Sequence, residues 1–450
     1  MTRPQHPMGS APVLPLLLRM AVPPMLSMLI QSLYNVVDSI FVARLSNDAL
    51  TAVSLAYPLQ NMVLAVAVGF GVGANAYVAR QLGRGEQEQV DRAASMGLVF
   101  TALHSLVFLF VGLFLARPFL QLFTQDAHVL AMSLVYTRLV ICLCAGSMLH
   151  IYIEKLLQAV GNMMAPMVLQ MVGAIVNIIL DPVLIFGLWG LPAMGVAGAA
   201  LATVIGQITA CLLAVAYFAK ANTGIHIQWR YLKPDASTAA RLYSVAIPSG
   251  LMTAMPSLLV AVLNALLVDL HALAVAVFGL YFKLQTFVYM PANGLIQGMR
   301  PLISYNYGAG KLDRMHSTIR WSLALTAGMM GAGTLLFWLL PNPIMALFGA
   351  DPEMMRLGVE MLRITSMGFL VSTLGTVLAG CFEALAKGLQ SLTITLVRQL
   401  VVIPPLALVF SQWIGLSGVW VAFPVAELLA ALLALVLYRQ TMAKLQKISA

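Results

Sequence analysis

Long, mostly apolar segments recur along the entire chain and constrain its fold more than any other feature. Each has about 20 or more residues, enough for an α-helix to cross the hydrocarbon core of a bilayer. Strands of a transmembrane β-barrel alternate polar and apolar residues, which these segments do not. Only 9% of the 450 residues are charged and 61% are apolar, which excludes a soluble enzyme, a disordered protein and a secreted disulfide scaffold. We predict an all-α membrane protein with twelve transmembrane helices, over residues 13–42, 50–78, 94–116, 129–153, 163–188, 194–219, 242–268, 272–299, 318–340, 355–380, 391–411 and 415–438.

Basic residues are distributed unevenly between alternate loops. If both termini are cytoplasmic, 17 Lys and Arg residues, Lys155 and Arg300 among them, are assigned to the cytoplasmic side, against Arg44, Arg117 and Arg356 on the other. Cytoplasmic loops of membrane proteins collect Lys and Arg. The pattern therefore predicts a multi-pass protein of a bacterial inner membrane with cytoplasmic termini, and it accounts for the net charge of +9 without a nucleic-acid partner.

The chain contains two similar halves. The longest polar connection, residues 220–241, separates an N-terminal lobe (1–219) from a C-terminal lobe (242–450), each with six predicted spans. A shift of 225 residues places four glycines of the first half on glycines of the second and aligns Asp126 with Asp351; the glycine pairs are Gly69 and Gly294, Gly73 and Gly298, Gly83 and Gly308, and Gly85 and Gly310. Halves with an even number of spans share one orientation, so we expect a pseudo-two-fold axis along the membrane normal and a cavity at the interface, as in secondary transporters.

Motifs for ATP hydrolysis or covalent catalysis are missing from the sequence. The pair Gly310-Lys311 lacks the remainder of a phosphate-binding loop. We interpret the histidines within predicted spans, His104 and His150, as isolated residues without an acidic partner at helical spacing. We therefore predict a non-enzymatic transporter without a cofactor, driven by an ion gradient or by a partner ATPase.

Ionisable residues at membrane depth are costly and are the first candidates for function. Asp38 and Asp181 lie late in two outward-running spans, and Asn177 shares a helix face with Asp181. Pro182 has no N–H, so it leaves the carbonyl of Ile178 free. Two carboxylates, an amide and a free carbonyl form a candidate Na⁺ site; alternatively, the two carboxylates share a proton. The structural alternative is that Asp38 ends a helix and Asp181 lies at a buried kink.

The second half carries a different set of charges. Its residues at membrane depth are Lys283, Glu360, Arg363, Arg398 and Glu427. We expect Glu360 and Arg363, three residues apart, to neutralise each other. The excess of positive groups makes this half a poor cation site. Glu427 is the second candidate acid, although a hydrogen-bonded packing role is the simpler interpretation.

Methionines are abundant in the first and seventh predicted spans. Flexible thioethers suit a cavity that accepts many apolar shapes, so we assign to a substrate cavity the residues Met28, Gln31, Tyr34, Met252 and Met255. Ordinary core filling explains any single methionine equally well.

The sequence resembles the multidrug and toxic compound extrusion (MATE) family over nearly its whole length. The resemblance rests on SLYNVVDSIFVARLSNDALTAVSLAYPLQ (32–60), LQAVGNMMAPMVLQMVGAIVNIILDPVLIFG (157–187), GVAGAALATVIGQ (195–207) and MPANGLIQGMRPLISYNYGAGKLDR (290–314). The last stretch, with GCFEALAKG and LVRQLVVIPPLAL, is most similar to the DinF/MepA-like bacterial branch.

This resemblance implies two six-helix lobes in a V that export lipophilic organic cations in exchange for H⁺ or Na⁺. It also implies a coupling site at Asp38, Asn177 and Asp181, with Thr203 as a weaker member. The glutamate of the NorM-like pattern is replaced here by Met255-Pro256. Small cationic substrates and membrane lipid are the expected partners, and a monomer suffices.

Two other functions remain open. Related folds flip lipid-linked precursors, which requires a basic lining for a phosphate headgroup; Lys283, Arg363 and Arg398 are the candidates. An embedded enzyme would turn over its substrate without any gradient.

Overall fold

The computed structural model describes residues 6–233, 235–349 and 351–449, and for residues 446–449 only the backbone. The described part of the chain consists of helices and loops. The first six spans are α2 (Val13–Ala43), α3 (Asn47–Arg84), α4 (Gln87–Phe110) continued by η1 (Val111–Leu115) and α5 (Ala116–Gln121), α6 (Ala127–Cys142) with α7 (Ala145–Ala159), α8 (Met164–Phe186) and α9 (Val196–Lys220).

The second half repeats this order. Its spans are α10 (Ala236–Leu270), α11 (Ala274–Gly308), α12 (Leu312–Leu339), α14 (Pro352–Ala384), α15 (Gly388–Leu396) continued by η4 (Val397–Val402) and α16 (Ile403–Ile414), and α17 (Leu416–Ser449). Short helices α1 (Pro7–Ser10), η2 (Leu188–Gly190), η3 (Trp229–Tyr231) and α13 (Pro341–Ala346) lie in the connections. The prediction of twelve helices is confirmed.

Eleven of these spans meet the length and hydropathy expected of a transmembrane helix, counted over the described residues and taking α6 and α7, bent by 43°, as one. The twelfth, α11, is less apolar because it places Asn293, Gln297 and Arg300 on a central cavity. A helix that faces a cavity does not need apolar residues on that side. Helix α11 also continues to Gly308, well beyond the predicted end at residue 299.

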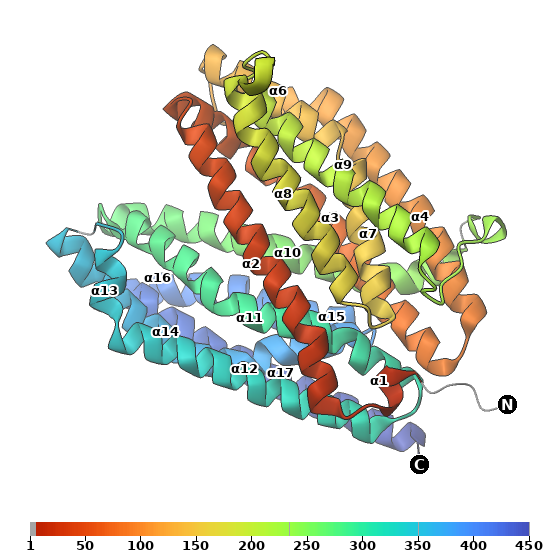
Figure 1. The fold of residues 1–450 in the computed structure, drawn as a ribbon. Coiled ribbons are helices and arrows are strands. Elements are labelled where there is room, and N and C mark those ends of the chain that lie inside the picture. The colour runs from red at the N-terminus through yellow and green to blue at the C-terminus, as the bar shows by residue number, and fades with distance from the viewer. Residues whose placement is uncertain (1–5, 234, 350, 450) are drawn as a thin grey trace.

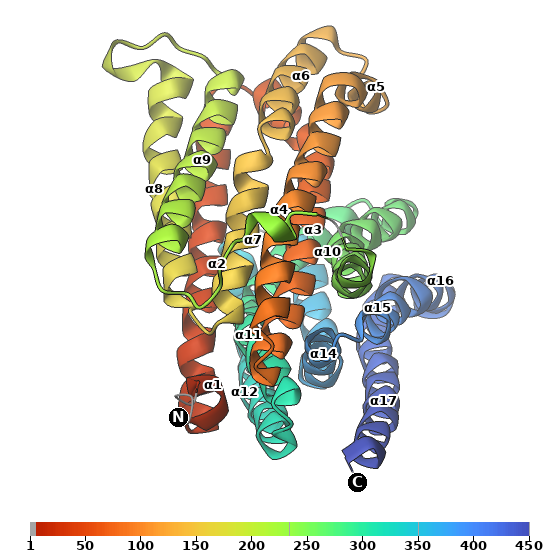
Figure 2. The same ribbon diagram turned by 90° about the vertical axis from the view of Figure 1, so that its right-hand side faces the viewer.

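The helices form two lobes arranged as a V (Figure 1). The ends of the described chain lie at the same end of the molecule, where the lobes converge (Figures 1 and 2). The connection predicted as a linker over residues 220–241 is shorter than expected, because α10 begins at Ala236. Asp235 caps that helix by accepting a hydrogen bond from the backbone N–H of Thr238 at 2.9 Å.

Glycines explain how the lobes fit together. The first helix of each lobe packs closely on the second helix of the other. Glycine is needed for this approach, because a Cβ on Gly69 of α3 would lie 2.6 Å from the carbonyl oxygen of Ala246 in α10. Likewise, a Cβ on Gly294 of α11 would lie 2.7 Å from the backbone nitrogen of Met25 in α2. Nearer the chain ends, Gly83 and Gly308 let α3 and α11 approach each other backbone to backbone. Each glycine pair that repeats in the sequence thus occupies equivalent places in the two lobes.

Candidate functional site

A cavity of about 1300 Å³ lies between the two lobes. Helices α2, α3, α6, α7, α8 and α9 line it from the N-terminal lobe, and α10, α11, α14, α15, η4, α16 and α17 from the other. The lobes meet at the end that carries both termini and diverge at the opposite end (Figure 1). Tyr57, in the half of α3 that lies away from the termini, lines the cavity and is exposed. The cavity is therefore open on the side away from the termini.

Unpaired oxygen atoms mark the N-terminal wall of this cavity. Asp181 is completely buried and Asn177 is 3% exposed; the Asn177 amide donates to Asp181 Oδ1 at 3.4 Å. Asp181 Oδ2, Asn177 Oδ1 and Asp38 Oδ1 are buried without a hydrogen-bond partner. Asp38, Asn177 and Thr203 line the cavity, whereas Asp181 lies just behind them. Buried acceptors without partners are costly in a folded protein, so they indicate a binding site.

Small residues bring helices α8 and α9 together beside Asn177. Gly206 of α9 packs so closely on α8 that an added Cβ would lie 3.1 Å from the Cβ of Asn177. Gly173 allows the same approach one turn earlier, where its own Cβ would lie 3.0 Å from the carbonyl oxygen of Gly206. Helix α8 continues through Pro182, which has no N–H to offer the carbonyl of Ile178. The site therefore has fixed walls on the α8–α9 side.

The residues of this site fit a small cation or a proton. The charges of Asp38 and Asp181 lie close enough to interact with each other, and no ion pair to Lys or Arg involves either carboxylate among the described residues. Oxygen-only donors of this kind suit a hard cation such as Na⁺. Two neighbouring carboxylates without a basic partner also suit a proton.

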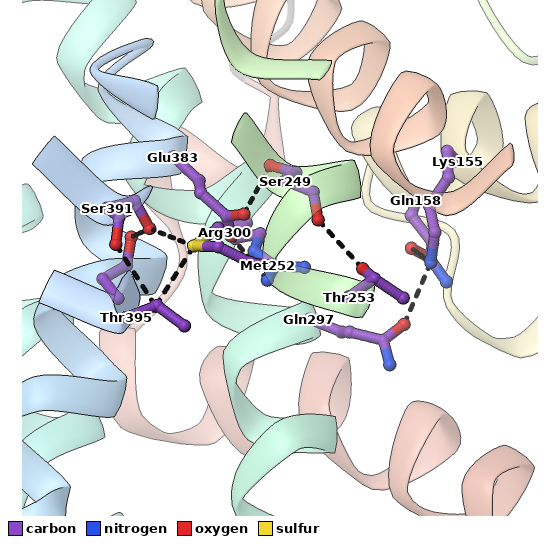
Figure 3. Close-up of polar contacts among 11 residues, drawn as sticks. Lys155, Gln158, Ser249, Met252, Thr253, Gln297, Arg300, Glu383, Ser391 and Thr395 are labelled. Carbon is purple, nitrogen blue, oxygen red and sulfur yellow. Dashed lines mark hydrogen bonds and ion pairs between the residues drawn. The ribbon is translucent and has the colours of Figure 1, made fainter. Parts of the chain in front are cut away.

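The floor of the cavity holds a polar cluster that sequence reasoning missed. Lys155 Nζ donates to Glu154 at 2.9 Å, to Gln158 at 3.0 Å and, across the lobe interface, to Gln297 at 3.0 Å. Figure 3 shows Gln158 and Lys155 on one side of the cluster and Gln297 facing them from α11. The assignment of Lys155 to a cytoplasmic loop is wrong, because Lys155 is 6% exposed within α7.

The expectation that His150 has no acidic neighbour at helical spacing is also wrong. His150 lies four residues before Glu154 on α7, and both side chains line the cavity. Residues four apart share a helix face, so His150 does have an acidic neighbour at helical spacing.

A matching cluster occupies the C-terminal side of the floor. Arg300 pairs with Glu383 of α14 at 2.6 Å, and Ser249 of α10 donates to the same carboxylate at 2.5 Å (Figure 3). Arg300 was also expected in a loop but lies in α11 on the cavity. The 225-residue shift relates Arg300 to Asn75 and Glu383 to Gln158. This alignment of polar residues in the two halves is the sequence feature from which the polar clusters at the cavity floor could have been predicted.

The C-terminal wall carries an ion pair between Arg398 of η4 and Glu427 of α17, at 3.4 Å. Neither Lys283 nor Arg363 is among the lining residues. The predicted pairing of Glu360 with Arg363 is wrong: Glu360 accepts a hydrogen bond from Ser417, and no ion pair joins it to Arg363 in the described chain.

Four of the five residues assigned to a substrate cavity lie on its wall: Met28, Gln31, Tyr34 and Met252. Met28 Sδ accepts a hydrogen bond from Gln297 at 3.5 Å, and Met252 Sδ accepts from Ser391 and Thr395 (Figure 3). Met255 is 8% exposed and does not line the cavity.

Two six-helix lobes around a cavity open on one side define a membrane transporter. The MatE family model matches residues 23–183 and 248–409, one segment in each lobe. The chain belongs to this family, the multidrug and toxic compound extrusion transporters, as the sequence motifs predicted.

Relatives and solved structures agree with this assignment. The chain is 26% identical over 428 residues to the multidrug export protein MepA of Staphylococcus aureus (strain MSSA476), covering 95% of this chain and 94% of that protein. MepA of Staphylococcus haemolyticus is 26% identical over 420 residues, covering 93% and 92%.

Two solved structures share the fold. One is an outward-facing conformation of a multidrug resistance MATE family transporter of the MOP superfamily, with a TM-score of 0.92 and 22% identity over 99% of this chain and all of that one. The other is a MOP superfamily transporter from Pyrococcus furiosus, described as having a binding pocket of reverse polarity, with a TM-score of 0.92, 22% identity and 99% coverage of both chains.

Proposed function

We propose that this transporter is an antiporter that exports lipophilic organic cations in exchange for Na⁺ or H⁺. The observation that carries the proposal is a large cavity shared by both lobes, with unpaired carboxylates on one wall only. Its volume of about 1300 Å³ exceeds the range of about 300–1,000 Å³ typical of small-molecule sites, so compounds of different shapes fit. Relatives named as multidrug export proteins support the same direction of transport.

The charge of the lining favours a cationic substrate. The four acids on the wall are Asp38, Glu154, Glu383 and Glu427, and the three strong bases are Lys155, Arg300 and Arg398. Each base faces one of the acids, which leaves Asp38 unmatched, with Asp181 behind it. A flippase for phosphate-bearing lipids would need unmatched bases instead, and this lining offers none among the described residues.

The coupling ion would bind at Asp38, Asn177 and Asp181. Their three unpaired oxygens give an incoming cation ligands that nothing else in the described chain uses. If the termini are cytoplasmic in a bacterial inner membrane, the cavity in this structure opens to the outside. This conformation would release the substrate and take up the coupling ion. One monomer contains both the cavity and the ion site.

A gradient-swap assay tests this proposal. The purified protein is reconstituted in proteoliposomes, and movement of a fluorescent organic cation is followed under a pH gradient alone and then under a Na⁺ gradient alone. We expect one of the two gradients to drive accumulation against the dye's own gradient. Transport of the dye that neither gradient changes would contradict antiport.

A further inference from the structure

We propose a second substrate subsite, on the C-terminal wall of the cavity, that binds hydrogen-bond-donating nitrogen groups (amine or amidine N–H) of planar aromatic cations through Glu427 and Gln399. The inference rests on the proposed function and refines its substrate class.

The first observation is a pair of unsatisfied acceptors. Glu427 is 9% exposed and lines the cavity; its Oε1 accepts from Arg398 at 3.4 Å, whereas its Oε2 is buried without a partner. Gln399, the residue after Arg398, also lines the cavity, and its Oε1 is equally buried and unpartnered. A buried acceptor left without a donor carries an uncompensated desolvation cost, and a bound N–H group removes that cost.

The second observation is the backbone that presents these side chains. Arg398 and Gln399 belong to the π-helical turn η4, in which the N–H of Ile403 bonds the carbonyl of Arg398. Pro404 and Pro405 follow directly and have no N–H groups for the carbonyls one turn earlier. Both Arg398 and Gln399 of this widened turn line the cavity. Single π-turns within α-helices occur frequently at functional sites.

The third observation is charge. Arg398 neutralises Glu427, so this wall has no net charge to attract a bare metal ion. The free oxygens of Glu427 and Gln399 lie on a wall that also carries the Arg398 guanidinium. They suit N–H donors of a conjugated cation, whose positive charge is spread over its rings. The rings of Phe282, Tyr289 and Phe423 line the same cavity, and the Tyr289 hydroxyl is already bonded to Ser372 at 2.8 Å. The rings therefore offer apolar faces to a planar guest, while Glu427 and Gln399 bind its N–H groups.

A matched pair of dyes tests the subsite. Proflavine carries exocyclic NH₂ groups, whereas acridine orange has the same cationic ring with dimethylamino groups that donate nothing. Binding of each dye to the purified full-length protein in nanodiscs is measured by fluorescence anisotropy. We expect Gln399→Leu to weaken proflavine binding by about tenfold and to change acridine orange binding by less than about twofold. Glu427→Gln leaves Arg398 without its ion-pair partner, so it should weaken binding of both cationic dyes, and proflavine by the larger factor.

Gln158→Leu is the control, because the Gln158 amide oxygen already accepts from Lys155; it should leave the ratio of the two affinities unchanged. Equal losses for the two dyes, or unchanged proflavine binding, would overturn the subsite. If Glu427→Gln does not fold, as judged by size-exclusion chromatography, Gln399→Leu decides alone. The result is separable from the proposed function: intact discrimination without gradient-driven transport refutes antiport only, and coupled transport without discrimination refutes the subsite only.

Discussion

The two lobes have the same helices in the same order, yet they treat buried charge differently. In the N-terminal lobe, Asp38 and Asp181 retain free oxygens and have no basic partner among the described residues. In the C-terminal lobe, Glu427 and Glu383 are each paired with an arginine. The duplicated scaffold therefore has one wall with unpaired carboxylates and one wall whose carboxylates are paired with arginines. Under the proposed function, this difference would separate ion coupling from substrate recognition.

The largest expected effect comes from removing the unpaired carboxylates. Asp181→Asn and Asp38→Asn should each reduce gradient-driven efflux by about tenfold or more. A neutral amide binds the coupling cation too weakly for that ion to favour one conformation of the transporter over the other. The measurement is the ratio of dye efflux with and without the driving gradient in proteoliposomes. Glu427→Gln should preserve that ratio. A loss of coupling in Glu427→Gln as large as in Asp181→Asn would refute the division between the lobes.

The next largest effect is expected at two equivalent glycines, Gly83 and Gly308, where the lobes contact each other. Gly83→Ala and Gly308→Ala should each destabilise the protein by about 1–3 kcal/mol, because the new Cβ would overlap the backbone of the opposite lobe. Thermal unfolding in detergent measures the loss. Gly331→Ala, with no heavy atom within 4 Å of its Cβ position, is the control and should cause no loss. A clearly unequal response of Gly83 and Gly308 would show that the interface is not symmetric.

A smaller effect is expected at the cavity floor, where Lys155 bonds one glutamine in each lobe. Gln297→Leu removes the bond between lobes, and Gln158→Leu removes one within the N-terminal lobe. Only Gln297→Leu should favour separation of the lobes at the termini, by about fivefold in population. Spin labels at the exposed Glu86 and Asp313, with the four native cysteines replaced, report this distance. Identical distance distributions for both variants would contradict the idea.

The smallest effect concerns two helix caps related by the 225-residue shift. Asp126 caps α6 by accepting from the backbone N–H groups of His128 and Val129, and Asp351 caps α14 through Met354. Asp126→Ala and Asp351→Ala should each lower the unfolding temperature slightly. The caps thus test the similarity of the lobes outside the membrane.

The Asp126 cap also has a pH signature. The backbone N–H groups of Val129 and His128 hold the pKa of Asp126 below its ordinary value. Its contribution to stability is therefore present at neutral pH, above the pKa of the unfolded chain, and is lost as pH falls through the lowered pKa. The difference between wild type and Asp126→Ala should shrink in acid. Asp126→Asn keeps a capping oxygen without a charge, so its unfolding temperature should lack this pH dependence.

Apolar segments were sufficient to predict the twelve helices, because a bilayer requires the same length and composition of every lipid-facing helix. They were misleading at the cavity floor. Lys155 and Arg300 were assigned to loops because charge counting places basic residues outside the membrane. Both residues instead lie in helices whose polar side faces the cavity, where Lys155 bonds the neighbouring Glu154 and the distant Gln297, and Arg300 pairs with the distant Glu383.

The site was partly readable for a related reason. Asp38 and Asp181 stand out because acids are rare in apolar segments, and Asn177 follows from helical spacing. Glu427 stands out for the same reason, whereas Gln399 gives no such signal, since a glutamine beside an arginine is an ordinary pair in a sequence. Each of these two side chains has an oxygen without a hydrogen-bond partner. That property depends on η4 and on the helix α17 that packs against it, which only the three-dimensional arrangement reveals.

The packing of each lobe's first helix on the second helix of the other lobe has a consequence for biogenesis. The side of α3 that holds Gly69 and Gly73 packs on α10, and α2 packs on α11. While the ribosome is still synthesising the second half, these surfaces of the first half have no protein neighbour and must be covered by lipid. The N-terminal six helices therefore complete their tertiary structure only after residues near 300 have entered the bilayer, which makes final assembly a late, post-insertion event.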